Sequence, residues 1–142
     1  ALLKQKKEGI AAPLAPMILL WYLRSLALFY FVNGLMHWSR IIGVLGPGFE
    51  TMPVHMQIAT VYFAVLQVVA SVGLWCGATW GVAAWLFSAV AELVMHIGFV
   101  DLFGSAWLIV TFHLVTILVY VGLAWWTGTP ENTGEILRLP EE

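Results

Sequence analysis

The residues best suited to chemistry are a glutamate and four histidines, set in a largely apolar sequence. Glu92 and His96 lie four residues apart, so on a helix their side chains share one face. A charge near the centre of a bilayer costs roughly 2.5 to 3.5 kcal/mol. Unpaired in lipid, Glu92 would be protonated, whereas beside a histidine or Arg40 it can stay ionised, and the sequence leaves both states open.

A second polar stripe is formed by Asn33, His37 and Arg40, whose i, i+4 and i+7 spacing places them along one helix face. His55 and His113 fall in two further apolar runs. Because lipid cannot solvate such groups, we expect the stripes to turn toward one another. The predicted polar or ligand cluster comprises Asn33, His37, Arg40, His55, Glu92, His96 and His113.

Several kinds of chemistry suit this cluster. Carboxylate and imidazole bind zinc, iron or copper, and two histidines from separate helices can hold a b-type haem. The candidate metal ligands are Glu92, His96 and His113, with His37 able to approach from a neighbouring helix. Acidic and histidine side chains also form proton or quinone paths. The structural alternative is hydrogen bonding between helices, and the spacing alone does not choose, because any helix with Glu and His four apart matches it.

The elements that must position these residues follow from composition. The chain has 142 residues, of which 61% are hydrophobic and 10% charged, with a mean hydropathy of +0.91. Soluble domains are about a quarter charged. We therefore predict an all-α integral membrane protein that binds no nucleic acid, since no basic patch is present. The single cysteine, Cys76, excludes an intrachain disulfide and any multi-thiolate metal site.

Four apolar runs are each long enough to cross a bilayer, which takes about 20 residues of helix. Between the second and third runs only Gly77, Ala78 and Thr79 remain, which predicts a tight antiparallel hairpin. We expect one membrane domain over residues 1–142, with the basic start retained ahead of the first span and no signal peptide. The predicted spans are residues 17–42, 54–76, 80–100 and 106–127, with tails at 1–15 and 128–142.

The orientation is predicted by the positive-inside rule. Four spans place both termini on one side of the membrane. The basic residues on that side are Lys4, Lys6, Lys7, Arg24 and Arg138, against Arg40 alone on the other. We therefore expect an up-down bundle of four transmembrane helices with both termini cytoplasmic. In this frame the polar cluster lies in the outer half of the bilayer, with Glu92 and His113 at similar depth and Gln67 and Thr111 near the middle.

Three segments carry a resemblance to a known family. They are Y-L-R-S-L-A-L-F-Y-F-V-N-G-L-M-H-W in the first span, P-V-H-M-Q-I-A-T-V-Y-F-A-V-L in the second and A-E-L-V-M-H in the third. The sequence resembles an uncharacterised bacterial family of small four-span inner-membrane proteins, a domain of unknown function, over most of the chain outside its tails. The resemblance implies a multi-pass protein of the bacterial inner (plasma) membrane and supplies no catalytic role.

Two functions of different classes fit these observations. The first is a non-catalytic accessory subunit that packs against a larger inner-membrane complex of respiratory or photosynthetic type, with the lipid bilayer and that complex as partners and no cofactor required. The alternative is a small redox or ligand-binding membrane protein with a metal, haem or quinone site in the outer leaflet. The sequence favours the first, because it has tiny loops and no visible catalytic motif.

Overall fold

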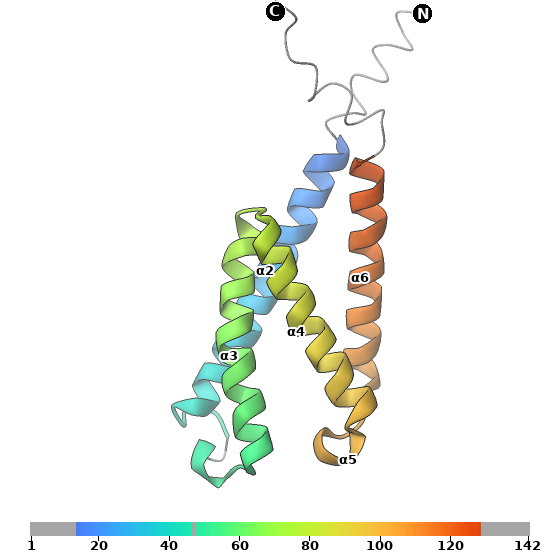
Figure 1. Cartoon of the computed structure of the whole chain (residues 1–142). Coiled ribbons are helices and arrows are strands. Elements are labelled where there is room, and N and C mark those ends of the chain that lie inside the picture. The colour runs from blue at the N-terminus through green and yellow to red at the C-terminus, as the bar shows by residue number, and fades with distance from the viewer. Residues whose placement is uncertain (1–13, 47, 129–142) are drawn as a thin grey trace, which may run out of the picture. The chain divides into compact units, whose positions relative to one another are not determined.

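The computed structural model describes residues 14–46 and 48–128, which form helices joined by short turns, with no strand among them (Figure 1). Most of both predicted tails, with Lys4, Lys6, Lys7 and Arg138, lies outside the described residues. The elements are α2 (Leu14–Ile41), the 3-10 turn η1 (Phe49–Thr51), α3 (Val54–Trp75), α4 (Thr79–Gly98), α5 (Val100–Phe103) and α6 (Trp107–Thr127).

The four longer helices α2, α3, α4 and α6 are each long and apolar enough to cross a membrane. The shortest, α4, has 20 residues, and at 1.5 Å per residue it measures about 30 Å, the thickness of the hydrocarbon core. The chain is therefore a multi-pass helical membrane protein, as its composition predicts.

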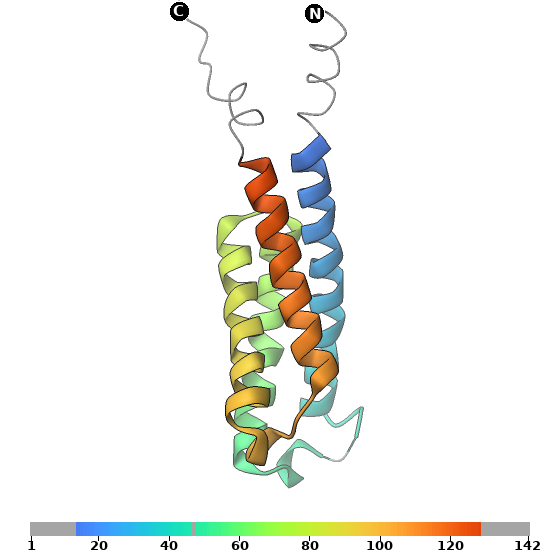
Figure 2. The same cartoon turned by 90° about the vertical axis from the view of Figure 1, so that its right-hand side faces the viewer.

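The helices occur where the apolar runs predict them, with small differences at their ends. Within the described residues the first is already helical at Leu14, before the predicted start at Met17, because Pro16 is tolerated in a first helical turn. The third ends at Gly98 instead of Val100. Phe99 leaves helical geometry with φ of −122° and ψ of 47°, and the short helix α5 follows before the chain enters α6 (Figure 2).

Two compact units share the long helices. One is Leu23–Leu114, and the other consists, within the described chain, of residues 14–22 and 115–128. In the smaller unit the Tyr22 hydroxyl donates to the main-chain carbonyl of Thr116 at 2.6 Å. All seven residues of the predicted cluster belong to the larger unit, which is the one that positions the site.

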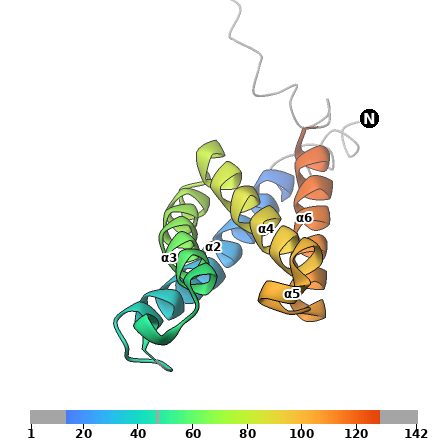
Figure 3. The same ribbon diagram turned by 60° about the horizontal axis from the view of Figure 1, so that its bottom comes forward.

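Helices α3 and α4 lie side by side in the larger unit as the predicted tight hairpin (Figures 1 and 3). The turn uses Gly77 with a positive φ of 67°, a conformation that favours glycine. A Cβ on Gly73 would overlap the Cα of Gly81, and a Cβ on Gly81 would overlap the backbone of Gly73. The two backbones therefore touch, and no side chain larger than hydrogen fits at the crossing.

The interior of the larger unit combines small, aromatic and polar side chains. The small ones bring the helices close together, and Trp38 ties α2 to α3 by donating from Nε1 to the Ala64 carbonyl at 2.9 Å. Most large apolar side chains instead point outward, as expected for helices in lipid. The buried residues include Leu26, Ala27, Tyr30, Phe63, Ala64, Gln67, Ala70, Leu74, Trp85, Ser88, Ala89, Val110 and His113.

The glycine crossing yields a stability prediction. Gly73→Ala is expected to destabilise the fold by about 1–3 kcal/mol, because overpacking against the Gly81 backbone outweighs the roughly 1 kcal/mol gain in helix propensity. Thermal unfolding in mild detergent measures this. The control is Gly122→Ala on α6, where an added Cβ meets nothing within 4 Å and stability should hold or rise. Equal losses of stability in Gly73→Ala and Gly122→Ala would contradict the close contact between Gly73 and Gly81.

Candidate functional site

The centre of the larger unit holds a chain of side-chain hydrogen bonds that passes through all four long helices. Asn33 on α2 donates from Nδ2 to Oε1 of Gln67 on α3 at 2.9 Å. Gln67 donates from Nε2 to Oε1 of Glu92 on α4 at 2.8 Å. The other carboxyl oxygen of Glu92 lies 2.5 Å from Nε2 of His113 on α6.

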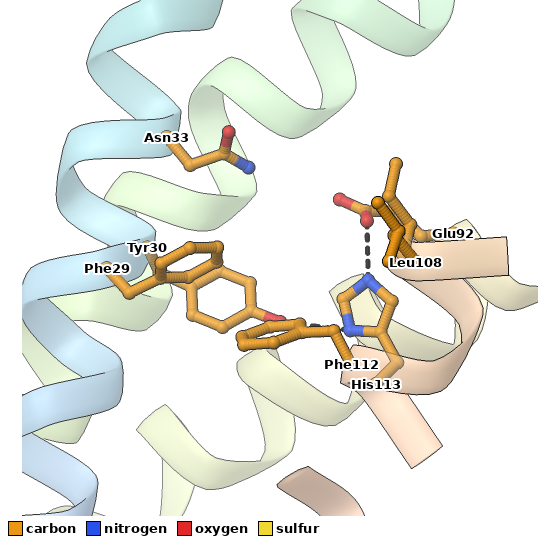
Figure 4. Close-up of a pocket in the computed structure, with 8 residues that line it drawn as sticks. Phe29, Tyr30, Asn33, Glu92, Leu108, Phe112 and His113 are labelled. Atoms are coloured by element: carbon orange, nitrogen blue, oxygen red, sulfur yellow. Dashed lines mark hydrogen bonds and ion pairs between the residues drawn. The ribbon is translucent and has the colours of Figure 1, made fainter. Parts of the chain in front are cut away.

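The chain of bonds then returns to α2, because His113 Nδ1 lies 3.2 Å from the Tyr30 hydroxyl (Figure 4). Tyr30 and Asn33 stand three residues apart on the same helix, so the bonds form a closed path, which we call the polar circuit. Its inner members are fully enclosed: Tyr30 and Gln67 are 0% exposed and His113 is 2% exposed. In lipid, where water cannot replace a lost bond, the circuit holds the four helices in register.

The polar circuit contains an acid and an imidazole that share one proton position. An ionised Glu92 accepts from the Nε2 hydrogen of His113, whereas a protonated Glu92 donates to a bare Nε2. In either case the second ring nitrogen keeps the Tyr30 hydroxyl as a partner, because a hydroxyl both donates and accepts. When Nδ1 carries a hydrogen that it donates to the Tyr30 hydroxyl, a proton can therefore move between the Glu92 carboxylate and Nε2 of His113 without leaving either group unpaired.

Beside the polar circuit lies a cavity of about 260 Å³, which we call the polar cavity. It extends along the α2 stripe from Asn33 past His37 to Arg40. Nδ1 of His37 is buried and has no hydrogen-bond partner among the described residues. The remaining lining residues are Met56, Ala59, Thr60, Phe63, Glu92, Met95, His96, Phe103 and Ile109.

A second cavity of about 250 Å³ also borders the polar circuit. It shares Asn33, Glu92 and Ile109 with the polar cavity but is otherwise mostly apolar. Figure 4 shows Tyr30, Glu92 and His113 at this cavity, with the rings of Phe29 and Phe112 close by. The polar circuit thus borders both a polar space and an aromatic one.

The structure brings together most of the predicted cluster. Asn33, His37, Arg40, Glu92 and His96 all line the polar cavity, and His113 joins them through Glu92. His55 lies apart from this lining, with its ring edge-on to Phe103 at a centroid distance of 5.4 Å.

The three candidate metal ligands do not form one group. His96 Nδ1 donates to the Gly104 carbonyl at 3.0 Å, while Glu92 pairs with His113. Among the residues that the structure describes, no three His, Cys, Asp or Glu side chains are placed to hold a metal ion. Spacing of four residues predicts that Glu92 and His96 share one helix face. The partner of each depends on the neighbouring segment, which is α6 for Glu92 and the loop at Gly104 for His96.

Two members of the polar circuit lay outside the predicted cluster. Gln67 was expected only as a hydrogen-bonding group near the middle of the bilayer, and it proves to be the link between Asn33 and Glu92. Tyr30 was not predicted at all. The available signal was its position three residues before Asn33, on the same stripe of α2.

This fold and site define a multi-pass helical membrane protein with an enclosed polar interior. The chain belongs to DUF6163, a family of unknown function, whose model matches residues 17–130. The match confirms the resemblance to an uncharacterised family over most of the chain outside its tails. No curated protein and no solved structure matches the chain.

The polar circuit predicts strong coupling between Glu92 and His113. In a double-mutant cycle with Glu92→Leu and His113→Ala, we expect a coupling free energy between the roughly 0.6 kcal/mol average and the roughly 1.7 kcal/mol maximum reported for hydrogen bonds between membrane helices. Unfolding in detergent measures it. Ser71→Ala combined with His113→Ala is the control and should be additive, because Ser71 bonds within its own helix. Coupling near zero for the first pair would contradict the circuit.

Proposed function

We propose that this chain is a ligand-binding membrane protein that holds a small molecule in the polar cavity. The observation that carries this proposal is a cavity of about 260 Å³ lined by polar groups that the described residues leave unused. A buried donor or acceptor without a partner costs about 1–3 kcal/mol, and an unfilled space also forfeits packing contacts. A bound molecule that packs in the cavity and bonds to the His37 ring or the Arg40 guanidinium lowers both costs.

The polar circuit supports this proposal because it holds part of the cavity wall in place. Asn33 and Glu92 belong to both the circuit and the cavity wall, so their side chains are held in place from behind. Sites of this kind bind well when their polar groups are positioned before the ligand arrives, because less side-chain entropy is then lost. The circuit therefore keeps one end of the cavity ordered whether or not a ligand is present.

The proposed setting is the bacterial inner membrane, with the long helices in an up-down bundle and both termini in the cytoplasm. Pairs of contacts within the larger unit support opposite directions for neighbouring helices. Asn33 bonds Gln67 and Trp38 bonds Ala64, which fits antiparallel α2 and α3. Gln67 bonds Glu92 and Gly73 meets Gly81, which fits antiparallel α3 and α4. The bias of Lys and Arg toward the termini supports the orientation. In this setting Arg40, near the end of α2, lies toward the outer surface, and the polar cavity opens in the outer leaflet.

The orientation can be tested with the native cysteine. Cys76 is exposed at the α3–α4 turn, which the proposal places on the cytoplasmic side. A membrane-impermeant maleimide applied to intact spheroplasts should leave Cys76 unlabelled until the membrane is broken. In the Cys76→Ser background, Asp101→Cys, which places a thiol on α5, should react without disruption. The reverse pattern would invert the orientation.

The ligand-binding function can be tested without knowing the ligand. Ala59 lines the polar cavity, so Ala59→Phe should fill it, whereas Ala83→Phe adds the same bulk to an exposed position on α4. After mild extraction from native membranes, mass spectrometry should detect a co-purifying small molecule with the wild type and Ala83→Phe but not with Ala59→Phe. No enriched molecule, or equal amounts in all three, would refute the function.

The accessory-subunit hypothesis remains as a second proposal, supported by the apolar side chains at the α4–α6 connection. Phe99, Val100 and Leu102 are exposed there, and Trp107 and Leu108 are 79% and 88% exposed. Lipid or a partner protein can cover such a surface. Comigration of the same mild extract with a larger complex on a native gel would support a partner, and a lone protein would count against it.

A further inference from the structure

We infer that the ligand of the polar cavity is a small organic anion with an apolar body, bound through its charged group at Arg40 and His37. The inference rests on the proposed function and adds the class of molecule. It depends on three features of the cavity: the charges at its two ends, the nature of its walls and its size.

The charged groups are separated along the cavity. Arg40 has no acidic partner among the described residues, and it stands seven residues beyond Asn33, about 10 Å along α2. Glu92 is at the Asn33 end, where its two oxygens already contact Gln67 and His113. Arg40 is exposed near the end of α2, and its end of the cavity offers a positive charge without an acidic partner among the described residues. The Glu92 end holds an acid that already has two partners. A ligand carboxylate is favoured at Arg40, since guanidinium binds carboxylate through two parallel hydrogen bonds.

His37 adds a second polar contact between the two ends. The ring lines the cavity, and its buried Nδ1 has no hydrogen-bond partner among the described residues. An imidazole nitrogen can either donate to a carboxylate oxygen or accept from a carboxylic acid. The ring itself is stacked on Phe63 with centroids 5.9 Å apart and planes 28° apart, which limits its rotation. Arg40 and His37 together thus supply donors to one anionic group.

The walls between the ends are apolar. Phe63, Phe103 and Ile109 come from α3, α5 and α6, and Met56 and Met95 supply flexible side chains that adapt to a ligand's outline. The volume of about 260 Å³ lies just below the roughly 300 Å³ at which pockets for drug-sized ligands begin. The cavity therefore suits a molecule about the size of a single ring. A hydroxyl at its far end could donate to the remaining lone pairs of Glu92.

The test measures binding of defined probes to the full chain in an uncharged detergent by isothermal titration calorimetry. The probes are benzoate, 4-hydroxybenzoate and neutral benzyl alcohol. We expect benzoate to bind with one-to-one stoichiometry, 4-hydroxybenzoate to bind more tightly, and benzyl alcohol to bind at least about tenfold more weakly, because a hydrogen bond to a charged group is lost.

Variants assign the effect to the cavity. Arg40→Gln should weaken benzoate binding about ten- to hundredfold, with partial recovery in Arg40→Lys. Arg24→Gln is the matched control: it removes one positive charge from the same helix, but Arg24 contacts Trp75 away from the cavity and benzoate binding should be unchanged. Ala59→Phe should abolish binding of every probe.

The outcomes separate the two proposals. If benzyl alcohol binds as well as benzoate, and Ala59→Phe abolishes both, the cavity binds ligands but the anionic class is wrong. Failure of the wild type to bind either acid would also overturn that class. If Ala59→Phe binds benzoate like the wild type, the cavity is not the site and the proposed function fails as well. Loss of benzoate binding on adding phosphatidylglycerol would replace the small acid with a lipid headgroup.

Discussion

The constraint on which the structure depends is that lipid offers no hydrogen bonds to a buried polar side chain. Gln67, Glu92 and His113 must therefore satisfy one another, and the polar circuit is the arrangement in which they do so. Each bond in the circuit crosses from one long helix to the next. Apolar contacts alone discriminate weakly between helix rotations, because lipid tails are as apolar as the residues that they would replace, so the polar circuit supplies the specificity.

The close packing of the α3–α4 hairpin and the cavity beside it have a common structural cause. Gly73 and Gly81 let α3 and α4 touch near the turn. Away from that crossing, Gln67 and Glu92 must span the distance between the helices with their side chains. The space that remains next to them is walled by Asn33, His37 and Arg40, which gives the protein a polar cavity at the end of α2.

The polar residues fall into two groups, those that connect helices and those that line the polar cavity. His113 and Gln67 are enclosed and committed to neighbouring helices, which suits a supporting role. His37 and Arg40 line the cavity with no hydrogen bond or ion pair to the described residues at Nδ1 and the guanidinium, which suits contact with a ligand. Asn33 and Glu92 belong to both sets. A ligand that contacts Asn33 or Glu92 would therefore perturb hydrogen bonds that connect all four long helices.

The sequence by itself determined the number and position of the membrane-crossing helices, because apolar length and the residues that end a helix are local properties. It also placed Asn33, His37, Arg40, Glu92 and His96 in one polar region, since no such group can face lipid cheaply. Only the tertiary structure decided that Glu92 pairs with His113 while His96 bonds the Gly104 carbonyl, that Tyr30 and Gln67 complete the circuit, and that a cavity remains beside it. Those features depend on the rotation and crossing of helices, which are set by contacts such as Gly73 with Gly81 and not by spacing along one helix.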